Sequence, residues 1–170
     1  MKDEPIYIAY AIAVGIGATI ILDLWALFLK RAFNIVSANY CLVGRWLRYM
    51  PQGTFKHKNI AAAAKKDSEC IVGWAAHYAI GATFALILVT IVSPKWLEQP
   101  TMLPALLFGI ATVAMPFFVM HPSFGLGFAA SKTPDPTQAR LRSLLAHTIF
   151  GLGLYVSAVT LSSFLKLTSS

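Results

Sequence analysis

Four long stretches of the chain are almost wholly apolar, and charged residues gather between them. The stretches lie at about 6–29, 71–92, 102–120 and 143–165. A helix of ~20 residues rises about 30 Å, which matches the thickness of the hydrocarbon core of a bilayer. We therefore predict an all-α fold, an integral membrane antiparallel four-helix bundle, with residues 1–170 forming a single transmembrane domain.

The loop between the first two spans is predicted to contain a short helix. At roughly 40 residues this loop is too long to be a simple connector. Apolar residues recur every three or four positions between 36 and 50, and this spacing places Arg45 and Arg48 on the opposite face. Ser37 or Asn34 would cap the start of this helix. We expect it to lie in the membrane surface of the first cytoplasmic loop with its arginines toward lipid phosphates, or else to pack on the bundle.

The loop after the third span has two unusual parts. Residues 121–130 stay apolar, which is typical of a half-helix that dips into the membrane or of a surface segment. Asp135 and Pro136 then form an N-cap followed by a first helical residue, so the fourth helix should begin near residue 136.

Composition and charge support a membrane protein and argue against a nucleic-acid binder. Hydrophobic residues make up 57% of the chain and charged residues only 12%, against about 25% in soluble domains. The net charge of +7 is concentrated in two loops, because all Lys and Arg residues except Lys2, Lys95 and Lys166 lie within 30–70 or 121–142.

This uneven distribution predicts an orientation. Cytoplasmic loops are enriched in Lys and Arg, so we expect a multi-pass protein of the inner (plasma) membrane with both termini outside the cytoplasm. The basic loops would then face anionic lipid headgroups. Cys41 and Cys70 both fall in the first of these loops, so we expect reduced thiols and no disulfide.

Asp23 is an acid inside the first apolar run, and histidines occur in the other three. A carboxylate in hydrocarbon is costly unless it faces a bundle interior and finds a partner. Counting from the cytoplasmic boundary at 1.5 Å per residue places Asp23, His77 and His147 roughly 6–9 Å deep. His121 lies at the cytoplasmic end of the third span. We therefore predict a buried polar site that comprises Asp23, His77, His121 and His147.

Small or hydroxyl residues flank this predicted site one helical turn away. They are Gly15 and Thr19 on the first span, Gly73 and Gly81 on the second, and Ser143 and Gly151 on the fourth. Small residues let membrane helices approach closely, which favours hydrogen bonds between helices. They also leave room beside a histidine for a planar ligand such as haem.

Three interpretations of the site follow. In the first, the protein is structural or partner-binding, and the Asp/His site is a hydrogen-bonded lock for helix register. In the second, His77, His147 and Asp23 bind haem or a transition metal, for which imidazole and carboxylate are suitable ligands. In the third, the chain is a small proton-coupled transporter that works as a homo-oligomer. No catalytic motif is recognisable, so enzymatic activity is left undecided.

Several segments resemble a family of bacterial inner-membrane proteins known only as a domain of unknown function. The resemblance covers nearly the whole chain and is carried by ATIILDLWALFLKR at 18–31, NYCLVGRW at 39–46, NIAAAA at 59–64, GWAAHYAIG at 73–81, MHPSFGLGFAASKTPDP at 120–136 and ARLRSLLAHTIFGLGLY at 139–155. It implies an uncharacterised four-span membrane protein and supplies no activity.

Overall fold

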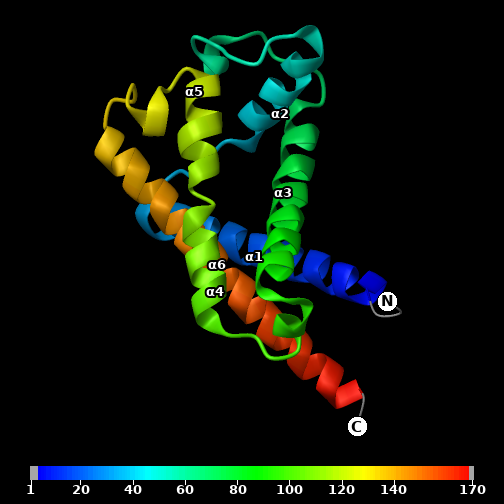
Figure 1. Ribbon diagram of the computed structural model, residues 1–170. Coiled ribbons are helices and arrows are strands. Elements are labelled where there is room, and N and C mark those ends of the chain that lie inside the picture. The colour runs from blue at the N-terminus through cyan, green and yellow to red at the C-terminus, as the bar shows by residue number, and fades with distance from the viewer. Residues whose placement is uncertain (1–3, 169–170) are drawn as a thin grey trace. The chain divides into compact units, whose positions relative to one another are not determined.

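The computed structural model describes residues 4–168, and within them it contains helices and no strand (Figure 1). The α-helices are α1 (Glu4–Phe33), α2 (Tyr40–Tyr49), α3 (Glu69–Val92), α4 (Met102–Ala111), α5 (His121–Phe124) and α6 (Pro136–Thr168). Short 3₁₀ turns occupy Met50–Gln52, Ile60–Ala62, Pro94–Leu97 and Phe128–Ala130, and Pro116–Met120 is a π-helical segment. The predicted all-α fold is confirmed.

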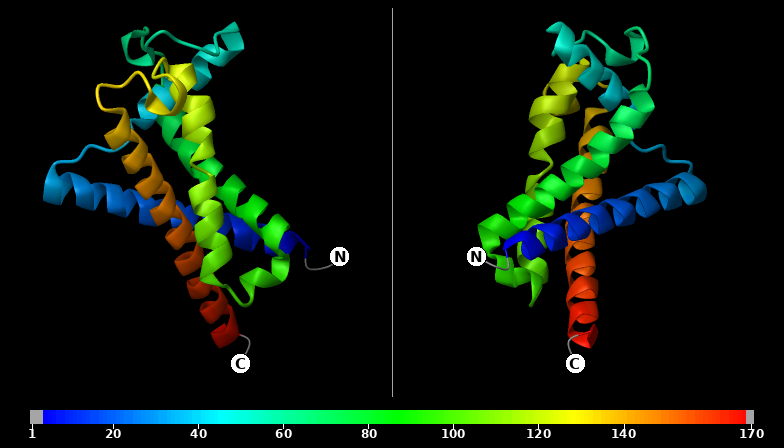
Figure 2. Two further views of the ribbon diagram at one scale, coloured as in Figure 1. Left: turned by 60° about the vertical axis from the view of Figure 1, so that its left-hand side comes forward. Right: turned by 90° about the vertical axis from the view of Figure 1, so that its right-hand side faces the viewer.

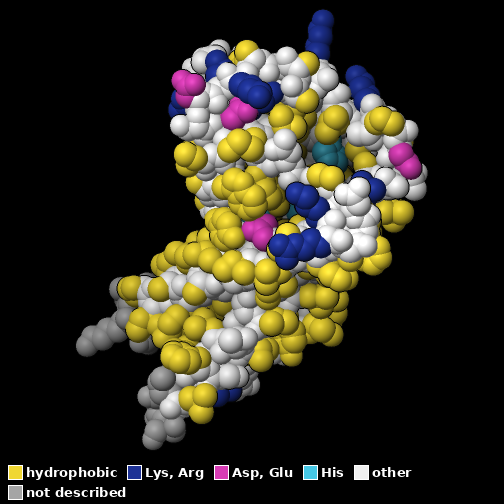
Figure 3. Space-filling model, turned by 180° about the vertical axis from the view of Figure 1, so that it is seen from behind, with side chains coloured by type: hydrophobic (Ala, Val, Ile, Leu, Met, Phe, Trp, Pro, Cys, Tyr) yellow, Lys and Arg dark blue, Asp and Glu magenta, His cyan; other side chains and the backbone are white. Residues whose placement is uncertain are grey.

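Four helical segments are long and apolar enough to cross a membrane. They are Pro5–Phe33, Glu69–Val92, Met102–Phe124 and Pro136–Leu167. In the most apolar window of each, only 22–28% of the residues are buried inside the protein. Hydrophobic side chains accordingly cover most of the visible surface along the long helices (Figure 3). This outward apolar surface is what a helix needs when its solvent is lipid.

The third of these segments is not a regular helix. The α4 helix ends at Ala111, and the chain continues through the π-helical segment that begins at Pro116. Proline cannot donate a backbone hydrogen bond inside a helix, which accounts for the irregular pitch at this point. The apolar residues after the span extend it as α5, which ends at Gly125 in the left-handed conformation (φ 86°).

The predicted start of the fourth helix is confirmed. Helix α6 begins at Pro136, and the side chain of Asp135 accepts a hydrogen bond of 2.9 Å from the backbone N–H of Gln138. This is the N-cap arrangement that the sequence indicates.

Neither predicted cap starts the loop helix, because the N-cap lies two residues after Ser37 and five after Asn34. Helix α2 begins at Tyr40, and its N-cap is Asn39, whose side chain accepts a hydrogen bond from the N–H of Cys41. Asn34 instead ends α1. It adopts φ 54°, and the N–H of Ile35 reaches back to the carbonyl of Leu29. The N–H of Asn34 donates to the carbonyl of Lys30 at 3.1 Å, which is the αL C-terminal motif, and asparagine suits this position because it tolerates the left-handed conformation.

The chain divides into two compact units. Unit 1 comprises Met1–Val36, Tyr78–Thr112 and Ala146–Ser170, and unit 2 comprises Ser37–His77 and Val113–Leu145. Helices α3 and α6 each contribute residues to both units. The single transmembrane domain therefore stays a prediction.

Unit 1 is held together by closely packed helices. Its core includes the fully buried side chains of Val14, Leu88 and Leu154. Helices α4 and α6 lie side by side (Figures 1 and 2), and a side chain at Gly109 would collide with the backbone of Gly151. Such contacts between small residues are how membrane helices gain van der Waals packing without a hydrophobic driving force.

Unit 2 is built where α2 packs on the first turns of α3. A Cβ atom at Gly44 would overlap the backbone of Glu69, and one at Gly73 would overlap the backbone of Tyr40. Beside this contact, a small core forms around the buried side chains of Val43, Ile60 and Phe124. The long first loop therefore folds into defined structure, as its length predicts.

Candidate functional site

Asp23 lies on α1 in unit 1 and is half-buried. Its carboxylate accepts a hydrogen bond of 2.9 Å from the hydroxyl of Tyr78 on α3. The sequence identifies Asp23 as a residue that needs a partner but does not identify Tyr78, which directly follows the predicted site residue His77. A hydroxyl group can donate a hydrogen bond to a carboxylate as an imidazole can. Tyrosines in the apolar runs are therefore also candidate partners for Asp23, and the predicted site did not include them.

His147 lies on α6 in unit 1, and its partner is also a hydroxyl group. Its Nδ1 atom is 2.7 Å from the Oγ1 atom of Thr112, the residue that caps the end of α4. Thr112 donates its single hydroxyl hydrogen to the carbonyl of Gly109 at 2.5 Å. With that hydrogen engaged, the Thr112 oxygen accepts from Nδ1 in the tautomer of His147 that carries its hydrogen there.

The other two predicted site histidines belong to unit 2 and lie among aromatic rings. His77 stacks on Tyr40, with ring centroids 3.9 Å apart and an interplanar angle of 22°. His121 lies beside Phe117 at 5.9 Å, and its Nδ1 atom is buried with no hydrogen-bond partner.

The small residues predicted to flank the site have several roles. In unit 1, Gly15, Thr19 and Gly81 meet where α1 approaches α3, and Thr19 donates its hydroxyl hydrogen to the carbonyl of Gly15 at 2.8 Å. Gly151 forms the close contact of α6 with α4. In unit 2, Gly73 lies under α2, and Ser143 is half-buried in the first turns of α6.

The donors for a metal are not gathered in one place. Among residues 4–168, no group of three or more His, Cys, Asp or Glu side chains is arranged so that it could hold a metal ion. The haem- or metal-binding interpretation, with His77, His147 and Asp23 as ligands, therefore gains no support from the arrangement of donors.

The charged contact in unit 2 was not predicted. Arg45 is 5% exposed, and its Nε and Nη2 atoms donate to the two carboxylate oxygens of Glu69 at 2.8 and 2.7 Å. The prediction that Arg45 points to lipid phosphates is therefore wrong, while Arg48 on the same helix is exposed. The helical spacing placed Arg45 on a polar face, but α3 packs against that face.

The remaining donors of Arg45 bind backbone carbonyls. Its Nη1 atom lies 3.0 to 3.2 Å from the carbonyl oxygens of Ile60, Ala61 and Ala63. The hydrogen bond with Glu69 raises the pKa of Arg45, so the guanidinium stays charged. One buried cation thus joins α2, the turn at Ile60–Ala62 and the start of α3.

A disulfide reinforces the same contact. Cys41 of α2 and Cys70 of α3 are bonded, with their Cα atoms 3.9 Å apart. The prediction of two reduced thiols is therefore wrong. That prediction rested only on the cytoplasmic location expected for the loop. The packing of α2 on α3, which brings the two cysteines together, is not visible in the sequence.

These features define an all-helical, multi-pass membrane protein with four spans, in which most of the loop between spans one and two and the loop between spans three and four belong to unit 2. The chain belongs to the family described as Protein of unknown function (DUF2938), whose model matches residues 12–161. This confirms the resemblance to a domain of unknown function. No curated protein and no solved structure matches the chain.

The Arg45–Glu69 pair should dominate the stability of unit 2. Removing one partner of a buried ion pair leaves an uncompensated charge, so Glu69→Gln should lower the free energy of unfolding by about 3–5 kcal/mol. Thermal unfolding in detergent, followed by intrinsic tryptophan fluorescence, measures the loss. Arg48→Gln is the matched control, because it also removes one charge but from an exposed site on α2. Equal effects of the two substitutions would contradict this prediction.

Proposed function

We propose that this chain is a non-enzymatic membrane protein, structural or partner-binding, in which polar side chains inside the spans hold the helices in register. The observation that carries the proposal is that Asp23 and His147 each meet a hydroxyl group from another helix, at 2.9 and 2.7 Å. Hydrogen bonds of this kind between membrane helices stabilise one packing arrangement over its alternatives.

The chemistry of the two contacts suits hydrogen bonds that hold helices together better than it suits proton transfer or metal binding. Tyr78 donates its hydroxyl hydrogen to Asp23, and Nδ1 of His147 shares a hydrogen bond with the hydroxyl of Thr112. A proton carrier needs a group that releases its hydrogen to water or substrate. A metal function needs converging donors, and the residues described here do not supply them.

The Asp23→Asn substitution distinguishes a structural role of Asp23 from a role in proton-coupled transport. Asparagine keeps a carbonyl that can accept from Tyr78 but cannot titrate. We expect only a small loss of thermal stability in Asp23→Asn and a larger one in Asp23→Leu, which removes the acceptor. Proteoliposomes of the wild type should carry protons no faster than empty vesicles. Proton flux in the wild type that disappears in Asp23→Asn would overturn the proposal in favour of a transporter.

The proposal includes an inner-membrane location with both termini outside the cytoplasm. The basic loops support this orientation, while the Cys41–Cys70 disulfide is the kind of bond that oxidising compartments preserve. A reporter fused after Ser170 distinguishes between the two orientations, because its activity depends on the side of the membrane on which the C-terminus lies. We expect an alkaline phosphatase fusion to be active and a green fluorescent protein fusion to be dark. The reverse pattern would place the basic loops and the disulfide together outside the cytoplasm.

A further inference from the structure

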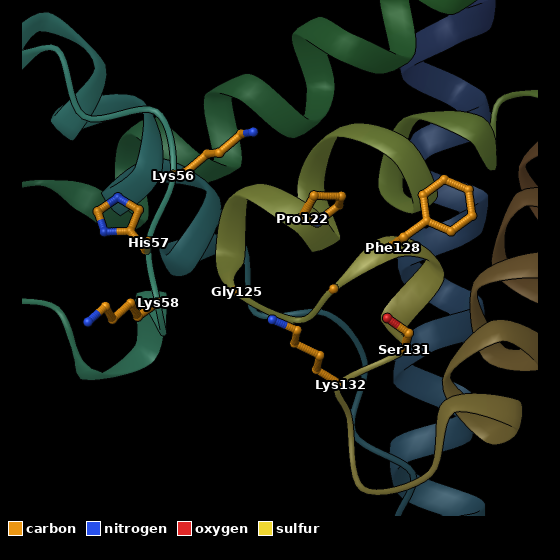
Figure 4. A pocket seen from close by; sticks show the side chains of 9 residues that line it. Lys56, His57, Lys58, Pro122, Gly125, Phe128, Ser131 and Lys132 are labelled. Atoms are coloured by element: carbon orange, nitrogen blue, oxygen red, sulfur yellow. The ribbon is translucent and has the colours of Figure 1, made fainter.

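Unit 2 contains a cavity of about 660 Å³ that plays no part in the contacts described above. One wall is the loop of Lys56, His57 and Lys58 (Figure 4). The facing wall is the end of α5 and the segment after it. Its lining residues are Pro122, Gly125, Phe128, Ser131 and Lys132 (Figure 4), together with Gly127.

The charge of this cavity has one sign. Lys56, Lys58 and Lys132 line it and are exposed, and no Asp or Glu is among the lining residues. Lysines on both walls make the electrostatic potential of this hollow positive, which favours binding of an anion. The hydroxyl of Ser131 adds a neutral donor at the same place.

Backbone contacts fix the two walls against each other. The N–H of His57 donates to the carbonyl of Ser123 at 2.8 Å. Gly125 adopts φ 86°, and a Cβ atom there would overlap the carbonyl of Lys58. Across the far wall, the N–H of Lys132 donates to the carbonyl of Leu126 at 2.8 Å. The cavity is therefore formed before any ligand arrives, which lowers the entropic cost of binding.

An apolar edge connects the cavity with the lipid-facing surface. Phe128 lines the cavity and is 59% exposed. Its ring centroid lies 4.8 Å from that of Phe118, which is 54% exposed and belongs to the membrane-capable segment Met102–Phe124. A ligand in the cavity can thus contact lysine side chains with one end and the exposed rings of Phe128 and Phe118 with the other.

We propose that this cavity is a binding site for an anionic phospholipid. The phosphate of the headgroup binds among Lys56, Lys58 and Lys132, and an acyl chain lies against Phe128 and Phe118. The aromatic edge selects a lipid over a free phosphate ion, because an inorganic anion gains nothing from it. This site is independent of the polar lock in unit 1, so either proposal can fail without the other.

Lipid binding to the purified protein tests the site. Native mass spectrometry in detergent would count adducts of phosphatidylglycerol and of zwitterionic phosphatidylcholine. Each lysine near a charged surface contributes enough for a several-fold change in affinity, so the Lys56→Gln/Lys58→Gln/Lys132→Gln variant should bind phosphatidylglycerol roughly 100-fold more weakly. Phosphatidylcholine binding should change little.

A matched variant controls for net charge. Arg48→Gln/Lys65→Gln/Arg142→Gln also removes three exposed cations, none of which lines the cavity. It should keep most of the wild-type affinity for phosphatidylglycerol. Equal weakening in both triple variants would overturn the site in favour of diffuse attraction, and so would unchanged binding in the cavity variant.

Two further measurements separate a lipid from a free anion. Phe128→Ala should weaken phosphatidylglycerol binding several-fold, and its thermal unfolding should show that unit 2 stays folded. Millimolar inorganic phosphate should not displace the lipid. Displacement by phosphate, together with unchanged lipid binding in Phe128→Ala, would identify an anion site and contradict the proposal.

Discussion

The absence of water inside a bilayer is the constraint from which the rest of this structure follows. Every polar group within the spans has to find its partner in the protein. The backbone does so by forming helices, and hydroxyl side chains do so by turning back on the preceding turn, as Thr83 does toward Ala79 and Thr90 toward Leu86. Asp23 and His147 lie inside the spans, and each reaches a hydroxyl on another helix.

The two units meet different physical demands. In unit 1, close contacts at glycine and alanine replace the hydrophobic effect, which does not operate between helices in lipid. Unit 2 contains charged groups that are costly to bury, and it compensates by surrounding Arg45 with a carboxylate and three carbonyls. The disulfide between Cys41 and Cys70 links α2 and α3 covalently at the same contact.

The fold was largely predictable because apolar runs of bilayer length permit few alternatives. The start of α6 at Pro136 followed from its cap residues. The partners of the polar residues were not predictable, since Tyr78 and Thr112 carry no signal that separates them from other hydroxyl residues in apolar runs. The position of Arg45 failed for a related reason. Helical periodicity shows which residues share a face, but it does not show whether that face meets lipid phosphates or the end of another helix.

We infer that Asp23 stabilises the protein through its hydrogen bond with Tyr78. A double-mutant cycle with Asp23→Ala and Tyr78→Phe, read from unfolding free energies in detergent, measures the interaction directly. We expect a coupling energy of about 0.6–1.7 kcal/mol, between the average and the maximum found for hydrogen bonds between membrane helices. Strictly additive effects of the two substitutions would show that the contact does not hold these helices together.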